Sequence, residues 1–273
     1  MSRCAVLAVF VFLFCLSTAE TPAAYTLVDK NSTAVIDDAS SMGMDSWTVD
    51  GTDHMFQQWF WYRVGSSGDE ASVDTLGAPT FALLSDVDPD PGKEHLVLRY
   101  TGTGFTLDLT FDLVGGSSGS GVSDITEAIA INNTGSSTLD FHFYQYVDFD
   151  LGGASGGDTV EVVSGSKVEQ SGGSGWVSET VITPDPSHHE AALFSTTRDK
   201  FSDGLATDLS DASGPVGPGN VTWAFQWDFS IPAGGTAIIS KDKHMVVPEP
   251  LTMAGLFLGI GGLTAYIRKR RTA

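Results

Sequence analysis

Three long stretches of this chain alternate apolar and polar residues with a period of two. The clearest is Phe105–Leu113, in which Phe and Leu alternate with Thr and Asp. Leu139–Leu151 and Trp223–Ile231 repeat the pattern, and the last of them stops before Pro232. Successive side chains of a strand point to opposite faces, so this alternation predicts half-buried β-strands.

Shorter segments of the same kind complete the expected fold. Weaker strands are predicted at 33–37, 44–50, 54–64, 80–86, 95–101, 122–132, 159–163, 175–183, 191–196 and 236–246. Segments rich in Gly and Ser, such as Gly115–Gly121, lie between strands and are typical of hairpin and sheet-crossing loops. Since no stretch of residues 20–246 shows helical periodicity, we expect one all-β domain there, a large antiparallel two-sheet sandwich.

One part of this domain resembles a known fold pattern. Residues Ile125–Leu151 read as an apolar strand, a turn at Asn132–Ser136 and a second apolar strand. This is similar to the hairpins of the galactose-mutarotase-type supersandwich. The resemblance concerns the fold alone and implies no site residue.

The C-terminal end, residues 247–273, combines three signals in a fixed order. The tripeptide Pro248-Glu249-Pro250 is followed by an uncharged apolar run at 251–267. The basic tail consists of Arg268, Lys269, Arg270 and Arg271. About 17 apolar residues rise about 25 Å as a helix, close to the lower limit for a transmembrane span. The basic tail predicts that this end stays cytoplasmic and that the domain before it faces away from the cytoplasm.

This C-terminal end resembles the PEP-CTERM sorting signal of exported proteins of Gram-negative bacteria. The resemblance implies that Pro248, Glu249 and Pro250 are recognised by exosortase, a membrane-embedded processing enzyme. It also implies a cell-surface or exopolysaccharide-associated protein, anchored in the inner membrane until it is processed. Two prolines favour an extended segment before the span, as a processing enzyme requires. An ordinary single-span anchor behind a Pro-rich linker is the alternative.

The N-terminus predicts export as well. A basic start, an apolar run at Ala5–Leu16 and small residues up to Ala19 form a signal peptide at 1–19 for signal peptidase, with Ala23 or Ala24 as alternative cleavage points. Both cysteines, Cys4 and Cys15, lie in this segment, so the mature domain is expected to have no disulfide.

The net charge of the chain narrows the classes of molecule that it is expected to bind. The chain carries a formal net charge of −20. Such a surface disfavours nucleic acid, whose phosphates need a cationic face, and disfavours docking on anionic lipids. It is compatible with polysaccharide, in which case acidic chains would be bridged by cations.

One acidic loop has the ligand spacing of a cation site. The carboxylates in question are Asp86, Asp88, Asp90 and Glu94. Hard oxygen ligands at alternating positions can converge on Ca²⁺, the one cofactor that the sequence suggests. Pro91 stands where an EF-hand has Gly, and Val97 cannot coordinate at the twelfth position, so an irregular calcium loop and a solvated turn both remain open.

The aromatic run Trp59-Phe60-Trp61-Tyr62 is the clearest candidate for a binding surface. On a strand, Trp59 and Trp61 share one face, while Phe60 and Tyr62 share the other. If the tryptophan face is exposed, it forms a stacking platform for sugar rings. The alternative is a central strand that is covered on both faces.

Ionisable residues suggest a weaker case for catalysis. Asp148 and Asp150 alternate on one strand and could serve as a carboxylate pair, or simply as outward-facing solubilising groups. His188 and His189 are expected in a loop. An enzyme would require His54, His142, Asp148 or Asp150 to converge with Arg63 or Arg99 on a concave face.

Two functions follow from these patterns. The favoured one is a non-enzymatic surface or exopolysaccharide-matrix protein with carbohydrate as its ligand class, since no catalytic motif is recognised and no catalytic residue is assigned. The alternative is a secreted carbohydrate-active enzyme with a carboxylate or His–carboxylate site in the sandwich cleft. A calcium-stabilised adhesin is a third reading, which depends on the Asp86–Glu94 loop.

Overall fold

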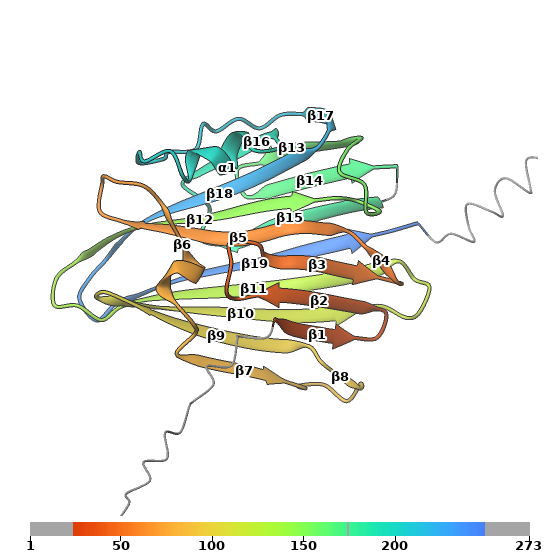
Figure 1. Cartoon of the computed structure of the whole chain (residues 1–273), viewed down its shortest axis with the longest axis horizontal. Helices are drawn as coiled ribbons and strands as arrows, with labels where there is room; N and C mark the ends of the chain where they lie inside the picture. Colours follow the sequence, from red (N-terminus) through yellow and green to blue (C-terminus); the bar gives the residue numbers. More distant parts are fainter. Residues whose placement is uncertain (1–23, 174, 249–273) are drawn as a thin grey trace, which may run out of the picture.

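The computed structural model describes residues 24–173 and 175–248, which fold into two sheets stacked face to face (Figure 1). The predicted signal peptide and the predicted span at 251–267 lie outside these residues. Within them, no helix has the length and apolar character needed to cross a membrane.

The first sheet, sheet A, has ten strands. Its order is β16 (His188–Leu193), β18 (Val221–Ile231), β12 (Leu139–Phe149), β5 (Met55–Val64), β3 (Gly43–Val49), β2 (Ser32–Asp37), β1 (Tyr25–Asp29) and β8 (Gly92–Lys93), with β4 (Thr52–Asp53) beside β3 and β6 (Ala71–Ser72) beside β5. Its pairs are antiparallel except for a short parallel contact between β3 and β5.

The second sheet, sheet B, has nine strands. Its order is β17 (Val216–Gly219), β13 (Asp158–Ser164), β14 (Lys167–Gly172), β15 (Gly175–Thr183), β19 (Thr236–Val246), β11 (Val122–Asn133), β10 (Phe105–Gly115), β9 (His95–Gly102) and β7 (Phe81–Ser85). Two short helical turns complete the fold, η1 (Val73–Leu76) beside β5 and α1 (Thr196–Lys200) against β16 and β18.

The alternation located the strands well but not completely. The all-β, antiparallel two-sheet prediction is confirmed, and the three most regular stretches are β10, β12 and β18. Strands β1, β14 and β17 and the two-residue strands β4, β6 and β8 were not predicted. In β14 only Val168 is apolar, so its strand conformation comes from pairing with β13 and β15. The loop expected at His188 and His189 is wrong, since both residues belong to β16 and pair with β18.

The core between the sheets is aromatic-rich. Four tryptophans are almost completely buried: Trp47, Trp59, Trp223 and Trp227. Rings from the two sheets interlock, as where Phe60 of β5 lies against Phe111 of β10. Burial on this scale provides the main stabilisation of a domain of this size.

Four charged side chains lie inside this core. On β19, Lys241 and Lys243 replace apolar residues on the face that buries Ile239 and Met245. Glu127 on β11 is the cross-strand partner of Lys241. Glu179 on β15 is the partner of Lys243.

The four charges pair with one another. Lys243 Nζ lies 2.6 Å from Glu127 Oε1 and 3.4 Å from Glu179 Oε1, and Lys241 contacts both carboxylates. Burial alone would raise the pKa of Glu127, but the adjacent lysine charges outweigh it and lower the pKa.

Sheet A completes this network from the other side of the core. Gln58 Nε2 donates to Glu127 over 2.7 Å, and Gln145 Nε2 donates to Glu179 over 3.0 Å. The Trp223 indole N–H also donates to Glu179, over 2.9 Å. The network therefore joins β5, β12 and β18 of sheet A to sheet B.

We expect Glu127→Gln to lower the free energy of unfolding by about 3–5 kcal/mol, because it leaves two buried lysines with one carboxylate. Urea denaturation measures the loss. Glu169→Gln, in the exposed Lys167–Glu169 pair, is the control and should cost less than about 1 kcal/mol. Equal losses for Glu127→Gln and Glu169→Gln would contradict the stabilising role of the buried ion network. The same conclusion would follow if the Glu127→Gln, Lys243→Met double variant lost as much stability as the two single variants added together.

Candidate functional site

A row of polar side chains crosses the face of sheet A that points away from sheet B. His142 of β12 lies between its cross-strand partners, Arg63 of β5 and Asp228 of β18. Side chains paired in this way lie side by side on one face. The row continues to His188 of β16, whose Nε2 lies 4.0 Å from Asp228 Oδ2.

Asp228 orients the imidazole of His142. Its Oδ1 lies 2.5 Å from His142 Nδ1 and also accepts from Gln226 Nε2 over 3.0 Å. A carboxylate oxygen accepts, so the tautomer that fits this contact carries its proton on Nδ1, and in the neutral imidazole the lone pair is then on Nε2. Nε2 is buried, has no hydrogen-bond partner among the residues described and lies 3.5 Å from Asp140, whose side chain is 58% exposed.

The other side of His142 is rigid and cationic. The buried Arg63 guanidinium donates from Nε to Glu70 over 3.0 Å and from Nη2 to the Tyr144 hydroxyl over 3.1 Å. Glu70 accepts in turn from the Thr207 amide over 2.9 Å, in the segment that follows α1. These contacts fix Arg63 in place beside the imidazole.

A second His–carboxylate pair flanks the row. His188 Nδ1 lies 3.0 Å from Asp211, and His189 Nε2 lies 3.0 Å from the Ser213 hydroxyl. The hydrogen bond with His188 lowers the pKa of Asp211. Two imidazoles thus bracket Asp228, at a place where the Asp211 and Asp228 side chains reach solvent.

A cross-strand His–Asp pair does not by itself indicate a catalytic site in this protein. His95 pairs with Asp112 and His244 with Asp124 on the outer face of sheet B, each at 2.6 Å. Only His142 also has an arginine as its other cross-strand partner. Its side chain is also the most buried of the three, with 14% exposed.

The sequence did not single out Asp228, Asp211 or Glu70. The signal for Asp228 was present, since it lies on the polar face of the regular stretch Trp223–Ile231. Nothing local showed that this stretch pairs with the strand of His142. Arg99, the other arginine expected at a site, forms a surface pair with Asp108.

Asp148 and Asp150 do not form an outward-facing pair. Asp148 is fully buried beneath the segment that contains α1, and neither of its carboxylate oxygens has a hydrogen-bond partner in the described structure. Burial and, to a smaller extent, the charge of Asp150 raise its pKa to about 7, against the opposing effect of Arg198 of α1. Buried His54 is adjacent, because its carbonyl accepts from the Asp150 amide.

The tryptophans do not form an exposed platform. Trp59 and Trp61 share a face, as expected, but they are 0% and 5% exposed. The Trp61 ring is stacked on Phe201, which follows α1, at 5.3 Å, and the Trp59 indole donates to Asp74 over 3.2 Å. The expectation of an exposed stacking surface is corrected, because a second layer covers this part of the strand.

The acidic loop does bring its carboxylates together. Asp86, Asp88 and Glu94 each place an oxygen within 4.8 Å of the others, and Asp88 and Asp90 do the same with Asp29. Lys30 lies 2.8 Å from Asp90 and neutralises part of this charge. Calcium binding here stays a prediction.

The sorting motif is described only at its first residue. Pro248 ends the described chain, after Val247 donates to the Gly121 carbonyl over 2.7 Å. Glu249, Pro250 and the basic tail at 268–271 lie outside the described residues.

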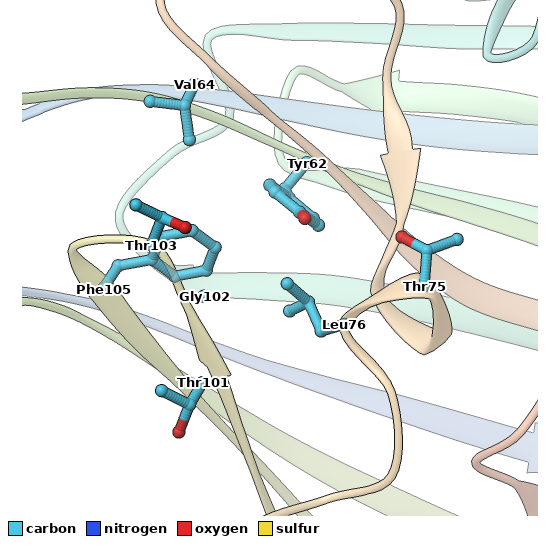
Figure 2. A pocket seen from close by; sticks show the side chains of 8 residues that line it. All are labelled: Tyr62, Val64, Thr75, Leu76, Thr101, Gly102, Thr103 and Phe105. Carbon is cyan, nitrogen blue, oxygen red and sulfur yellow. The ribbon is translucent and has the colours of Figure 1, made fainter.

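The gap between the sheets opens into a pocket at one end (Figure 2). It has a volume of about 610 Å³ and lies between β5, η1 and the hairpin that joins β9 to β10. Its lining residues are Tyr62, Val64, Thr75, Leu76, Thr101, Gly102, Thr103 and Phe105. None of the eight is charged, so the lining of this cleft offers no ionised side chain for proton transfer.

Comparison with solved structures identifies the fold. A galactose mutarotase related enzyme from Lactobacillus acidophilus superposes with a TM-score of 0.53 at 9% identity, over 84% of this chain and 99% of its own. A putative aldose 1-epimerase from Escherichia coli K12 gives 0.50 at 10% identity, over 82% and 98% of the two chains. A bacterial glucoamylase complexed with acarbose gives 0.50 at 11% identity, over 84% of this chain and 32% of its own.

No family model and no curated protein matches the sequence. At these identities the likeness is one of fold, and that fold is the one seen in enzymes that carry mutarotase, epimerase and glucoamylase names. The prediction of a non-enzymatic surface protein is therefore wrong on this comparison. The likeness favours the alternative prediction, a carbohydrate-active enzyme.

The buried carboxyl of Asp148 predicts a pH dependence of stability. The folded state holds the proton up to about pH 7, while the unfolded state releases it near the ordinary value of 3.8. The stabilising contribution is therefore complete below pH 4 and is lost as the pH rises to about 8, by about 4 kcal/mol.

Asp148→Asn should remove this dependence. Urea denaturation at pH 4 and pH 8 should show the variant gaining stability relative to the wild type at the higher pH. Asp140→Asn, exposed on the same strand, is the control and should gain little. A constant difference between Asp148→Asn and wild type at both pH values would contradict the burial argument.

Proposed function

We propose that this chain is an exported carbohydrate-active enzyme in which His142, oriented by Asp228, transfers a proton to and from a sugar. The observation that carries the proposal is the His142–Asp228 pair with a free Nε2, next to Arg63 on the outer face of sheet A. The likeness of the fold to mutarotase-related enzymes supports the substrate class.

The geometry suits a reaction at the anomeric centre of a free sugar. His142 Nε2 would take the proton of the anomeric hydroxyl as the bond between the anomeric carbon and the ring oxygen breaks, and a protonated acid would supply a proton to that oxygen. Reversal from the other face gives the second anomer. Asp228 would stabilise the imidazolium that forms, as a carboxylate partner of a general base does.

The second pair, His188 with Asp211, is placed to supply that acid. It lies on the far side of Asp228 and is in part open to solvent. Asp140 would have to move aside for substrate to reach Nε2, because its exposed side chain lies 3.5 Å from that atom. Arg63 would favour negative charge that develops on the sugar oxygens.

We expect His142→Gln and Asp228→Asn to lower the catalysed interconversion of α- and β-D-galactose by about 10²-fold or more, the usual contribution of a general base. Polarimetry of freshly dissolved sugar measures it, and release of reducing sugar from glycans tests hydrolysis in parallel. His95→Gln, in the matched pair on sheet B, should keep the wild-type rate. A wild-type rate no faster than the spontaneous one in both assays would refute the proposal.

We propose in addition that the chain is exported and sorted by the PEP-CTERM route, on the strength of the order of tripeptide, apolar run and basic tail in the sequence. After processing the enzyme would lie at the cell surface or in the extracellular matrix. A polysaccharide-rich setting agrees with the substrate class.

In a host that carries an exosortase, Glu249→Ala should keep its C-terminal tail while the wild type loses it. Cell fractionation with mass spectrometry of the C-terminus provides the measurement. Glu161→Ala, which removes an exposed carboxylate of the folded domain, is the control and should be processed like the wild type. If Glu249→Ala is trimmed as completely as the wild type, the sorting assignment fails.

A further inference from the structure

The pocket in Figure 2 lies apart from the His142 row. Tyr62 is the cross-strand partner of Phe143 and points into the space between the sheets, whereas its neighbour Arg63 points outward beside His142. The two sites therefore occupy opposite faces of the same end of β5. With about 610 Å³, the pocket falls in the usual range for small-molecule sites.

One wall of the pocket is a fixed aromatic surface. The Tyr62 ring lies parallel to Phe141, with centroids 5.8 Å apart and an interplanar angle of 8°. Phe105 packs edge-on against both rings, at 5.3 and 5.0 Å. A Cβ on Gly102 would lie 2.2 Å from the Phe105 ring, so glycine is needed there. A wall held in this way needs little ordering when a ligand binds.

The remaining lining offers hydrogen bonds without charge. Thr75, Thr101 and Thr103 contribute hydroxyls, and Thr75 Oγ1 donates to the Ser72 carbonyl over 2.6 Å, which leaves its oxygen free to accept. Burial raises the pKa of the Tyr62 phenol, so it stays neutral, with only a smaller opposing effect of Thr75.

We infer that this pocket binds the pyranose ring of a neutral saccharide, as a second site that does not take part in proton transfer. The C–H face of a sugar ring complements the electron-rich face of Tyr62, while its hydroxyls match the threonines. An anion is disfavoured by the net charge of −20, and no lining carboxylate can hold a cation.

Only the role of this pocket in the enzyme rests on the proposed function. A saccharide held on the inner side of β5 would keep a longer glycan at the end of the sandwich that carries His142. The ligand class itself comes from the lining of the pocket.

The test is isothermal titration of the full chain with methyl β-D-galactopyranoside and methyl α-D-glucopyranoside, whose anomeric centres are locked. We expect saturable binding of at least one. Val64→Trp should weaken it about tenfold or more, because Val64 is 46% exposed and a larger side chain there fills the pocket mouth. Tyr62→Phe keeps the ring and should stay within about threefold of the wild type.

His142→Gln separates this inference from the proposed function. It should leave unchanged the glycoside binding that Val64→Trp weakens, whatever its effect on anomer interconversion. Binding that is lost in His142→Gln and kept in Val64→Trp would overturn the inference, and so would no binding of either glycoside. The assignment of a neutral saccharide as the ligand class would be overturned if cyclohexanol or methyl glucuronide bound as tightly as the two glycosides and lost as much affinity in Val64→Trp.

Discussion

The ion network of Glu127, Glu179, Lys241 and Lys243 is the interaction on which the arrangement of the two sheets depends. All four groups are out of contact with water, so each is tolerable only while its partners are in place. Gln58, Gln145 and Trp223 reach the carboxylates from sheet A. A purely apolar core would tolerate small shifts of one sheet relative to the other. These directional hydrogen bonds form only in one relative position of the two sheets, that is, in one registration.

That registration affects the outer face of sheet A as well. Gln145 points inward from β12, so its neighbours Tyr144 and Tyr146 must point outward with His142. The strand β12, whose Gln145 donates to the buried Glu179 carboxylate, therefore also sets the direction of the candidate catalytic imidazole. The same face bears Asp148 further along β12, under the segment that contains α1, whereas Asp140 and Asp228 beside His142 reach solvent. The outer face of sheet A is therefore covered at one end and partly exposed to solvent at the other.

Much of the fold could be predicted, and rather little of the site. The alternation in Phe105–Leu113 is a local property, which any chain segment displays before it folds. The site depends on pairing between distant strands. His142 and Asp228 are far apart in sequence, and their contact is a consequence of register between β12 and β18. The burial of Lys241 and Lys243 also depends on distant strands, because lysines on an alternating strand suggest the solvent face unless their partners are known.

The sequence by itself determined most of the long strands and the all-β sandwich class, and it carries the patterns behind the export prediction, because all of these depend on hydrophobic period and composition along a short window. Only the tertiary structure decided which faces are covered. It buried Trp59 and Trp61, the latter against Phe201, placed four charges in the core, and assembled a His–Asp–Arg row from three strands. The physical reason is that burial and cross-strand contact depend on neighbours that are remote along the chain, and no local pattern records them.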